Sequence, residues 1–196
     1  HHAESAPVVR VPLNDFALVS RALDIGAEAI IAPMINSPAD ALRFASAAKY
    51  PPLGERSWGP LRAMALQSPR TAPVDYMREA NDGTLAFAMV ETATALACVD
   101  TIASTPGIDG LFVGPYDLAT ALSGGSAQDV QAAQVEQAIE TIRAAAKKAD
   151  KIPGIYCRDA ESAVAIAKRG YRFVIAGNDQ TTLRSATVAQ LKALKS

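Results

Sequence analysis

Three charged side chains lie at or just beyond short apolar runs that are typical of buried β-strands: Arg10, Glu91 and Asp117. Glu91 ends such a run, and Asp117 follows Gly114-Pro115, where glycine permits a close approach between backbone and ligand. The carboxyl ends of parallel strands meet at one edge of an α/β sheet, and active sites lie at that edge. Two carboxylates there favour a hard divalent cation that takes oxygen ligands and keeps positions open for substrate and water.

Each of these residues also has a purely structural interpretation. Glu91 would face the amino terminus of a helix expected to begin near Ala93, and Asp117 would cap a short helix at residues 118–122. Arg10 would form a buried ion pair with an acid of a neighbouring strand, because an unpaired buried charge is costly. Residue type and spacing alone leave both interpretations open.

The elements that must position these side chains alternate along the chain. Short β-branched runs are separated by longer Ala-rich segments of helical period, which is typical of βα units around a parallel sheet. Asp15 and Ser37 are expected to cap the first two helices. We expect strands at residues 8–11, 29–34, 85–91, 108–115, 152–157 and 173–177. We expect helices at residues 16–25, 37–49, 74–81, 93–104, 127–149, 160–169 and from 181 or 182 to 194.

About six βα units are expected in one domain, residues 1–196, and this number lies between two α/β architectures. A closed (β/α)8 barrel has eight units and typically about 250 residues, whereas an open doubly wound sheet accommodates six strands. The dinucleotide-binding G-x-G-x-x-G pattern and the P-loop are both absent from the sequence. The pattern by itself does not decide between barrel and open sheet.

Composition excludes several classes of partner. A formal net charge of -1 with scattered basic residues argues against nucleic acid. No apolar run approaches the roughly 20 residues that cross a bilayer, so we expect no membrane partner. Cys98 and Cys157 lie far apart without metal-binding spacing, which favours two reduced thiols and a cytoplasmic location. No lysine ends a predicted strand, and Lys151 only precedes the fifth, which argues against Schiff-base chemistry.

Five segments, in order along the chain, resemble successive motifs of the class II pyruvate-dependent aldolases, the HpcH/HpaI aldolase family. This family includes 4-hydroxy-2-oxo-heptane-dioate and 2-keto-3-deoxy-sugar-acid aldolases, with the citrate lyase β subunit more distant. The resemblance implies a (β/α)8 TIM-barrel type of fold, of which this chain holds about six units. The segments are residues 8–15 (VVRVPLND), 24–27 (DIGA), 50–56 (YPPLGER), 90–92 (VET) and 107–118 (GIDGLFVGPYDL).

The resemblance also implies roles for the residues that match the family's motifs. Glu91 and Asp117 would bind Mg²⁺ or Mn²⁺, with Co²⁺ also possible, and Arg10 would contact the 2-oxo oxygen and stabilise the enolate. Gly114 and Pro115 would keep the approach to the substrate carboxylate open.

Three further positions complete the implied substrate pocket. The backbone amides of Tyr116 and Asp117 would receive the substrate carboxylate. Tyr156 and Asn178 match positions that line the pocket, and Tyr156 stands where relatives often carry an aliphatic residue. The distal group of the substrate is therefore expected to differ. Asp179 is expected to cap the last helix.

The sequence departs from the family pattern in two places. Family members carry Gln two residues before the metal-binding Glu, and here that residue is Met89. Two upstream βα units, with an Asp and a His for acid–base work, precede the matching region in the family, and His1 and His2 do not fit that role. We therefore expect a longer native product, or a separate amino-terminal piece that completes the barrel.

The resulting hypothesis is a lyase that reversibly cleaves a 4-hydroxy-2-oxo acid to pyruvate and an aldehyde. One alternative is an acyl-CoA lyase of the citrate lyase β type, and another is a catalytically silent protein that binds metal and 2-oxo acid. By resemblance we expect a homo-oligomer, commonly a hexamer with exchanged C-terminal helices. Arg56 is expected either to reach substrate or a partner subunit or to lie solvated in its loop, and Trp58 either to line the pocket or to pack.

Overall fold

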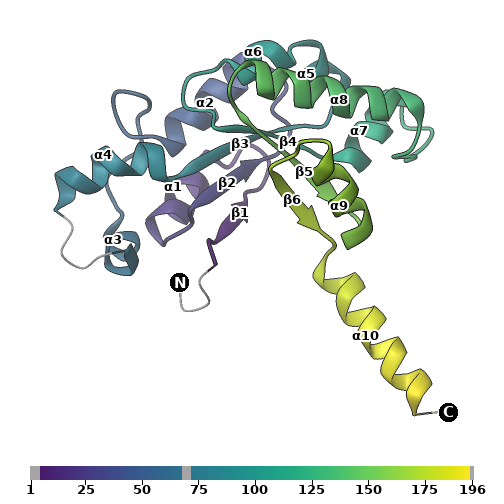
Figure 1. The fold of residues 1–196 in the computed structure, drawn as a ribbon. Helices are drawn as coiled ribbons and strands as arrows, with labels where there is room; N and C mark the ends of the chain where they lie inside the picture. Colours follow the sequence, from purple (N-terminus) through teal and green to yellow (C-terminus); the bar gives the residue numbers. More distant parts are fainter. Residues whose placement is uncertain (1–4, 68–71, 195–196) are drawn as a thin grey trace.

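A computed structural model of the protein describes residues 5–67 and 72–194 and contains one six-stranded parallel sheet (Figure 1). The strands are neighbours in chain order, β1-β2-β3-β4-β5-β6. A doubly wound sheet reverses its strand order near the middle, whereas a barrel does not. The order therefore excludes the open-sheet alternative. The strands are β1 (Val8–Arg10), β2 (Ala29–Ala32), β3 (Leu85–Val90), β4 (Gly110–Val113), β5 (Ile152–Cys157) and β6 (Phe173–Ala176).

Ten helices occur in the described ranges, and most of them cover the outer, convex face of the sheet (Figure 1). Asp15 and Ser37 cap α1 and α2 through their side chains, as predicted. The helices are α1 (Phe16–Asp24), α2 (Pro38–Ala48), α3 (Leu61–Gln67), α4 (Pro73–Gly83), α5 (Ala93–Ala97), α6 (Val99–Ala103), α7 (Pro115–Leu122), α8 (Ala133–Lys148), α9 (Ala160–Lys168) and α10 (Asp179–Ala193).

The sheet is strongly curled. The ring of Phe87 on β3 and that of Phe173 on β6 lie 4.8 Å apart between centroids, although two strands separate them. In a flat sheet these strands would be about 14 Å apart. A Cβ at Gly110 on β4 would overlap the Phe87 ring, so a glycine there gives the ring room to lean across the sheet. The curl is that of a partial barrel.

Side chains alternate between the two faces of the sheet. The convex face and the covering helices form the main core, which includes Ile30, Val90 and Leu111. The concave face carries a second apolar cluster that includes Ile31, Phe87, Met89 and Phe112. In the parallel register Arg10 lies beside Ile31, so the end of β1 faces the concave side.

A buried polar cluster closes the amino end of the sheet. Lys49, at 1% exposure, donates from Nζ to the carbonyl oxygens of Asn81 (2.7 Å) and Thr84 (2.6 Å) and pairs with Asp109 Oδ2 at 2.7 Å. The same Asp109 oxygen accepts from the Ala86 amide at 2.7 Å. These contacts connect α2 to the starts of β3 and β4, where barrel residues serve stability.

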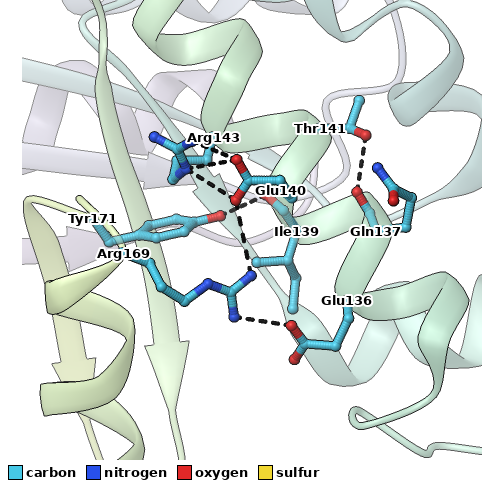
Figure 2. A network of polar contacts seen from close by, with 8 residues as sticks. All are labelled: Glu136, Gln137, Ile139, Glu140, Thr141, Arg143, Arg169 and Tyr171. Atoms are coloured by element: carbon cyan, nitrogen blue, oxygen red, sulfur yellow. Dashed lines mark hydrogen bonds and ion pairs between the residues drawn. The ribbon is translucent and has the colours of Figure 1, made fainter.

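A second polar network connects α8 to the segment between α9 and β6 (Figure 2). Arg169 Nη1 lies 2.9 Å from Glu136 Oε2, and Glu140 pairs with Arg143. The buried Tyr171 donates its hydroxyl to the Ile139 carbonyl oxygen at 2.8 Å. Exposed ion pairs contribute at most about 1 kcal/mol each, so the buried Tyr171 contact is the firmer of these attachments.

Two predicted helices differ from the structure in continuity or length, and one helix was not predicted. The segment expected as one helix at residues 93–104 is two short helices that break at Cys98 (φ -121°, ψ 23°). The long helix begins at Ala133 rather than residue 127, because Ser123 holds Ala127 in a turn through both its hydroxyl contacts. Helix α3 was not predicted; it belongs to an excursion between α2 and β3 with its own small core around Tyr50 and Tyr76.

The last helix, α10, points away from the rest of the described chain, and all of its residues are exposed (Figure 1). Among the described residues, no helix has both the length and the apolar character needed to cross a bilayer. Asn178, not Asp179, caps α10: its Oδ1 accepts from the Thr181 amide at 2.8 Å. The predicted role of Asp179 as the cap is therefore wrong.

Candidate active site

The carboxyl ends of β1, β3 and β4 bring the three predicted charged residues to one edge of the sheet. Arg10 is the last residue of β1, Glu91 directly follows β3, and Asp117 lies in the first turn of α7, just after β4. Asp117 and Arg10 both lie close enough to Glu91 to act on its pKa, Asp117 by raising it and Arg10 by lowering it. The structure therefore gathers them as the strand-end rule predicts.

Glu91 is the buried member of this group, at 2% exposure. Its Oε1 accepts a hydrogen bond of 2.7 Å from the backbone amide of Met34. Its Oε2 is buried and has no hydrogen-bond partner among the described residues. A carboxylate oxygen without a partner in a buried position is costly, and in native proteins such an atom calls for a ligand, an ion or a water.

The pKa of Glu91 is raised above its ordinary value. Burial is the main cause, and the negative charge of Asp117 acts in the same direction. The Met34 amide and the positive charge of Arg10 oppose the shift. A cation beside Oε2 would stabilise the ionised carboxylate that this environment otherwise disfavours.

Gly114 lies against the free oxygen of Glu91. It precedes α7 as its N-cap, and a Cβ added there would lie 2.5 Å from Glu91 Oε2 and 2.9 Å from Met89 Cε. Only glycine leaves that oxygen accessible. Met89, the residue that departs from the resemblance, is a buried apolar neighbour of the site at 5% exposure.

Of the structural alternatives, the capping of a helix by Asp117 and the buried ion pair of Arg10 are not what the structure shows. Glu91 bonds to Met34 of another loop, whereas Thr92 caps α5 by accepting from the Ala95 amide. Asp117 is exposed in the first turn of a helix whose N-cap is Gly114. Arg10 is exposed, and the ion pairs found within the described ranges do not include it.

Two tyrosines and an asparagine stand beside the charged group. The rings of Tyr116 and Tyr156 lie 6.1 Å apart, and Asn178 donates from Nδ2 to the Tyr156 hydroxyl at 3.1 Å. Pro115, Tyr116 and Tyr156 also line a cavity of about 460 Å³, but this cavity is bounded by α8 and α9, and Arg10, Glu91 and Asp117 are not among its lining residues. The structure therefore brings the predicted pocket residues of β4, β5 and β6 together at the same edge.

Arg56 and Trp58 lie away from this edge. Arg56, at 4% exposure, pairs with Asp24 at 2.8 Å and stacks over the Tyr50 ring at 4.6 Å. Trp58 packs on Tyr50 and Tyr76. The expectations of a substrate contact and of a solvated loop arginine are wrong for Arg56, because it is buried and paired with Asp24, while its Nε and Nη1 have no hydrogen-bond partner among the described residues. Contact with a partner subunit stays a prediction. His1 and His2 lie outside the described residues.

Glu91 and Asp117 fit a divalent cation that takes only a few of its ligands from the protein. Glu91 Oε2 is open and Asp117 is close enough to act on it, while Arg10 would balance charge. No group of three or more His, Cys, Asp or Glu side chains suited to a metal ion exists within residues 5–67 and 72–194. Mg²⁺ is usually bound by one or two carboxylates and keeps several coordination positions for water and substrate, which agrees with this pair of residues.

Sequence reasoning missed the loop that follows β2. Its Met34 amide bonds Glu91, and its Asn36 accepts from Thr92 Oγ1 at 2.5 Å. Both Asn36 and Thr92 are polar residues just past strand ends, so the strand-end rule, applied to every strand, identifies them. The role of the Met34 amide has no such signal, because a backbone group is independent of residue type.

Comparison with known proteins assigns the chain to a family. The HpcH/HpaI aldolase/citrate lyase profile matches residues 1–186. The chain belongs to this family. A hydroxypyruvate/pyruvate aldolase of Rhizorhabdus wittichii is 39% identical over 191 residues, 96% of this chain and 74% of that protein. A 4-hydroxy-2-oxo-heptane-1,7-dioate aldolase of Klebsiella pneumoniae is 37% identical over 91% of this chain and 66% of that protein.

Solved structures of the family confirm the partial barrel. An HpcH/HpaI aldolase of Desulfitobacterium hafniense superposes with a TM-score of 0.89 at 29% identity, covering 99% of this chain and 74% of that one. A Burkholderia cenocepacia family protein gives a TM-score of 0.86 at 37% identity, covering 100% of this chain and 76% of that one. The predictions of family, fold and aldolase-type lyase class are confirmed at this level.

Proposed function

We propose that this chain is a metal-dependent class II aldolase that reversibly cleaves a 4-hydroxy-2-oxo acid to pyruvate and an aldehyde. The observation that carries the proposal is the buried Oε2 of Glu91, which has no hydrogen-bond partner among the described residues. The charges of Asp117 and Arg10 both act on this carboxylate. Aldolase relatives at 35–39% identity support the same chemistry.

Glu91 and Asp117 would hold Mg²⁺, Mn²⁺ or Co²⁺ at this edge. When bound, such an ion supplies positive charge that polarises the 2-oxo group of the substrate. Glu91 presents one fixed oxygen, because the Met34 amide occupies the other. Asp117, exposed and at the start of α7, has the freedom to reach the same ion.

The remaining groups act on the substrate itself. Loss of the 4-hydroxyl proton to a base and cleavage of the C3–C4 bond would release the aldehyde and leave the pyruvate enolate, and the Arg10 guanidinium would offset the negative charge that develops on its 2-oxo oxygen. The amides that begin α7, at Tyr116 and Asp117, would bind the substrate carboxylate, and the absence of a side chain at Gly114 allows that approach. Tyr156, held by Asn178, would meet the aldehyde portion.

We also propose that residues 1–196 act as one catalytic unit within a homo-oligomer in the cytoplasm. The fully exposed α10 supports assembly, because its leucines would be covered by a partner. The free Cys98 and Cys157 support a reducing compartment. Sedimentation and subcellular fractionation test these two points.

The test measures pyruvate release from a 4-hydroxy-2-oxo acid with added Mn²⁺. Glu91→Ala and Asp117→Ala should each lower turnover by roughly a hundredfold or more, since each removes charge stabilisation at the reacting group. Asp100→Ala, which removes an exposed acid on α6, should leave turnover unchanged. Full activity of either site variant, or of the wild type in excess chelator, contradicts the proposal.

The same assay separates the alternatives. Mn²⁺ binding without pyruvate release would favour the catalytically silent protein. Release of an acyl-CoA product in place of pyruvate would favour the citrate lyase type.

A further inference from the structure

The loop after β2, residues 33–37, holds the Glu91 carboxylate from the side of the neighbouring strand. We infer that Asn36 is a positioning residue whose bond to Thr92 keeps the Met34 amide on Glu91 Oε1, so that Oε2 alone faces the cation. This inference rests on the proposed function, because it takes Glu91 as a cation ligand.

Met34 donates to Glu91 from a conformation that most residues avoid. Its φ is 55°, in the left-handed region that favours glycine. Such a conformation persists only where neighbouring contacts fix it, and it concentrates at functional sites. One fixing contact is next to it: the buried Ile35, at 2% exposure, donates its amide to the Met89 carbonyl oxygen at 3.3 Å.

Asn36 holds the same loop in place through three separate groups. Its amide donates to Asp40 Oδ2 at 3.2 Å, and its carbonyl oxygen accepts from Cys98 Sγ at 3.4 Å. Its side-chain Oδ1 accepts from Thr92 Oγ1 at 2.5 Å. These contacts reach α2, α5 and the end of β3, so the loop is fixed against three neighbouring elements.

The bond between Asn36 and Thr92 joins the two segments that must stay in register. Thr92 is the residue directly after Glu91, and Asn36 is two residues after Met34. If the bond is lost, the remaining contacts hold the Met34 amide on the Glu91 carboxylate less firmly, and the carboxylate can turn either oxygen toward the cation. Partners of metal-binding carboxylates fix ligand orientation in this way.

Four variants test the inference by Mn²⁺ binding, followed by electron paramagnetic resonance of free Mn²⁺, with no turnover needed. Asn36→Ala removes the acceptor alone, and Thr92→Val removes the donor in a similar volume together with the cap of α5. Thr92→Ser keeps the hydroxyl. Ser37→Ala is the matched control, because it removes the neighbouring cap of α2 but leaves the bond between Asn36 and Thr92 in place.

We expect Asn36→Ala and Thr92→Val to weaken Mn²⁺ binding roughly tenfold, the range seen when partners of metal ligands are removed. Thr92→Ser should stay within about twofold of the wild type, since it retains the donor. Ser37→Ala should lower the unfolding midpoint without changing Mn²⁺ affinity.

Outcomes distinguish this inference from the proposed function. If Glu91→Ala loses Mn²⁺ while Asn36→Ala and Thr92→Val bind as the wild type does, the positioning role is wrong and the cation site stands. The positioning role is also wrong if Ser37→Ala weakens binding as much as Asn36→Ala. If the wild type binds no Mn²⁺, or Glu91→Ala binds it equally well, the proposed function fails first.

Discussion

Lys49, at the amino end of the sheet, and Glu91, at its carboxyl end, are buried to 1% and 2% exposure. Lys49 directs its Nζ to three acceptors at 2.6–2.7 Å. Glu91 has one oxygen bonded and the other without a partner in the described structure. Both side chains lose their contacts with water on folding, but only Lys49 regains a polar partner for every hydrogen-bonding position.

The difference separates a structural charge from a functional one. A buried charge whose donors are all used stabilises the arrangement around it and has nothing left to offer a ligand. A buried carboxylate with an open oxygen costs stability unless something binds there. Burial and charge alone therefore do not mark a site, and neither does an unpartnered atom alone, since Arg56 also keeps Nε and Nη1 without a partner among the described residues. Glu91 differs from Arg56 because its open oxygen lies at the strand ends, where Asp117 and Arg10 act on it.

The largest expected effect comes from removing Lys49 at the amino end of the sheet, and it falls on stability. Lys49→Met should lower the free energy of unfolding by about 3 kcal/mol, because it leaves Asp109 and two carbonyl oxygens without their partner. Urea unfolding measures this. Lys148→Met, which removes an exposed lysine of α8, should change it by less than about 0.5 kcal/mol. Equal midpoints for Lys49→Met and the wild type would remove the contrast between the two ends.

At the carboxyl end of the sheet, where Glu91 Oε2 has no partner in the described structure, the expected effect falls on activity. Gly114→Ala would place a Cβ 2.5 Å from Glu91 Oε2, so the carboxylate must move. A displacement near 1 Å at a reacting group costs about a hundredfold in turnover. Gly83→Ala is the matched control, since a Cβ there meets nothing within 4 Å. Wild-type turnover by Gly114→Ala would show that Oε2 is not part of the site.

Much of the fold follows from local sequence. The six strands and the caps Asp15 and Ser37 were predictable because strand periodicity and N-cap chemistry are local properties. The break at Cys98 was not, because Cys98 Sγ bonds the Asn36 carbonyl oxygen, 62 residues away. The curl was not either, since it depends on how Gly110 and Phe87 meet in the folded sheet.

The candidate site divides in the same way. Strand-end position identified Glu91, Asp117 and Arg10, whereas the family resemblance supplied their proposed roles. The closed cluster at Lys49 and the ion pair of Arg56 with Asp24 were missed, because pairing across 32 residues leaves no spacing pattern. The Met34 amide is invisible to any analysis of residue types.

The smallest expected effect tests the central claim most directly: the shift in urea unfolding when Mn²⁺ is added. At ten times its dissociation constant, a ligand that binds only the folded state stabilises it by about 1.4 kcal/mol. We expect that shift for the wild type and, from a lower starting stability, for Lys49→Met. Glu91→Gln, which keeps the side-chain shape without the charge, should show none. An equal shift in Glu91→Gln, or no shift in the wild type, would contradict the assignment of the open carboxylate as the cation site.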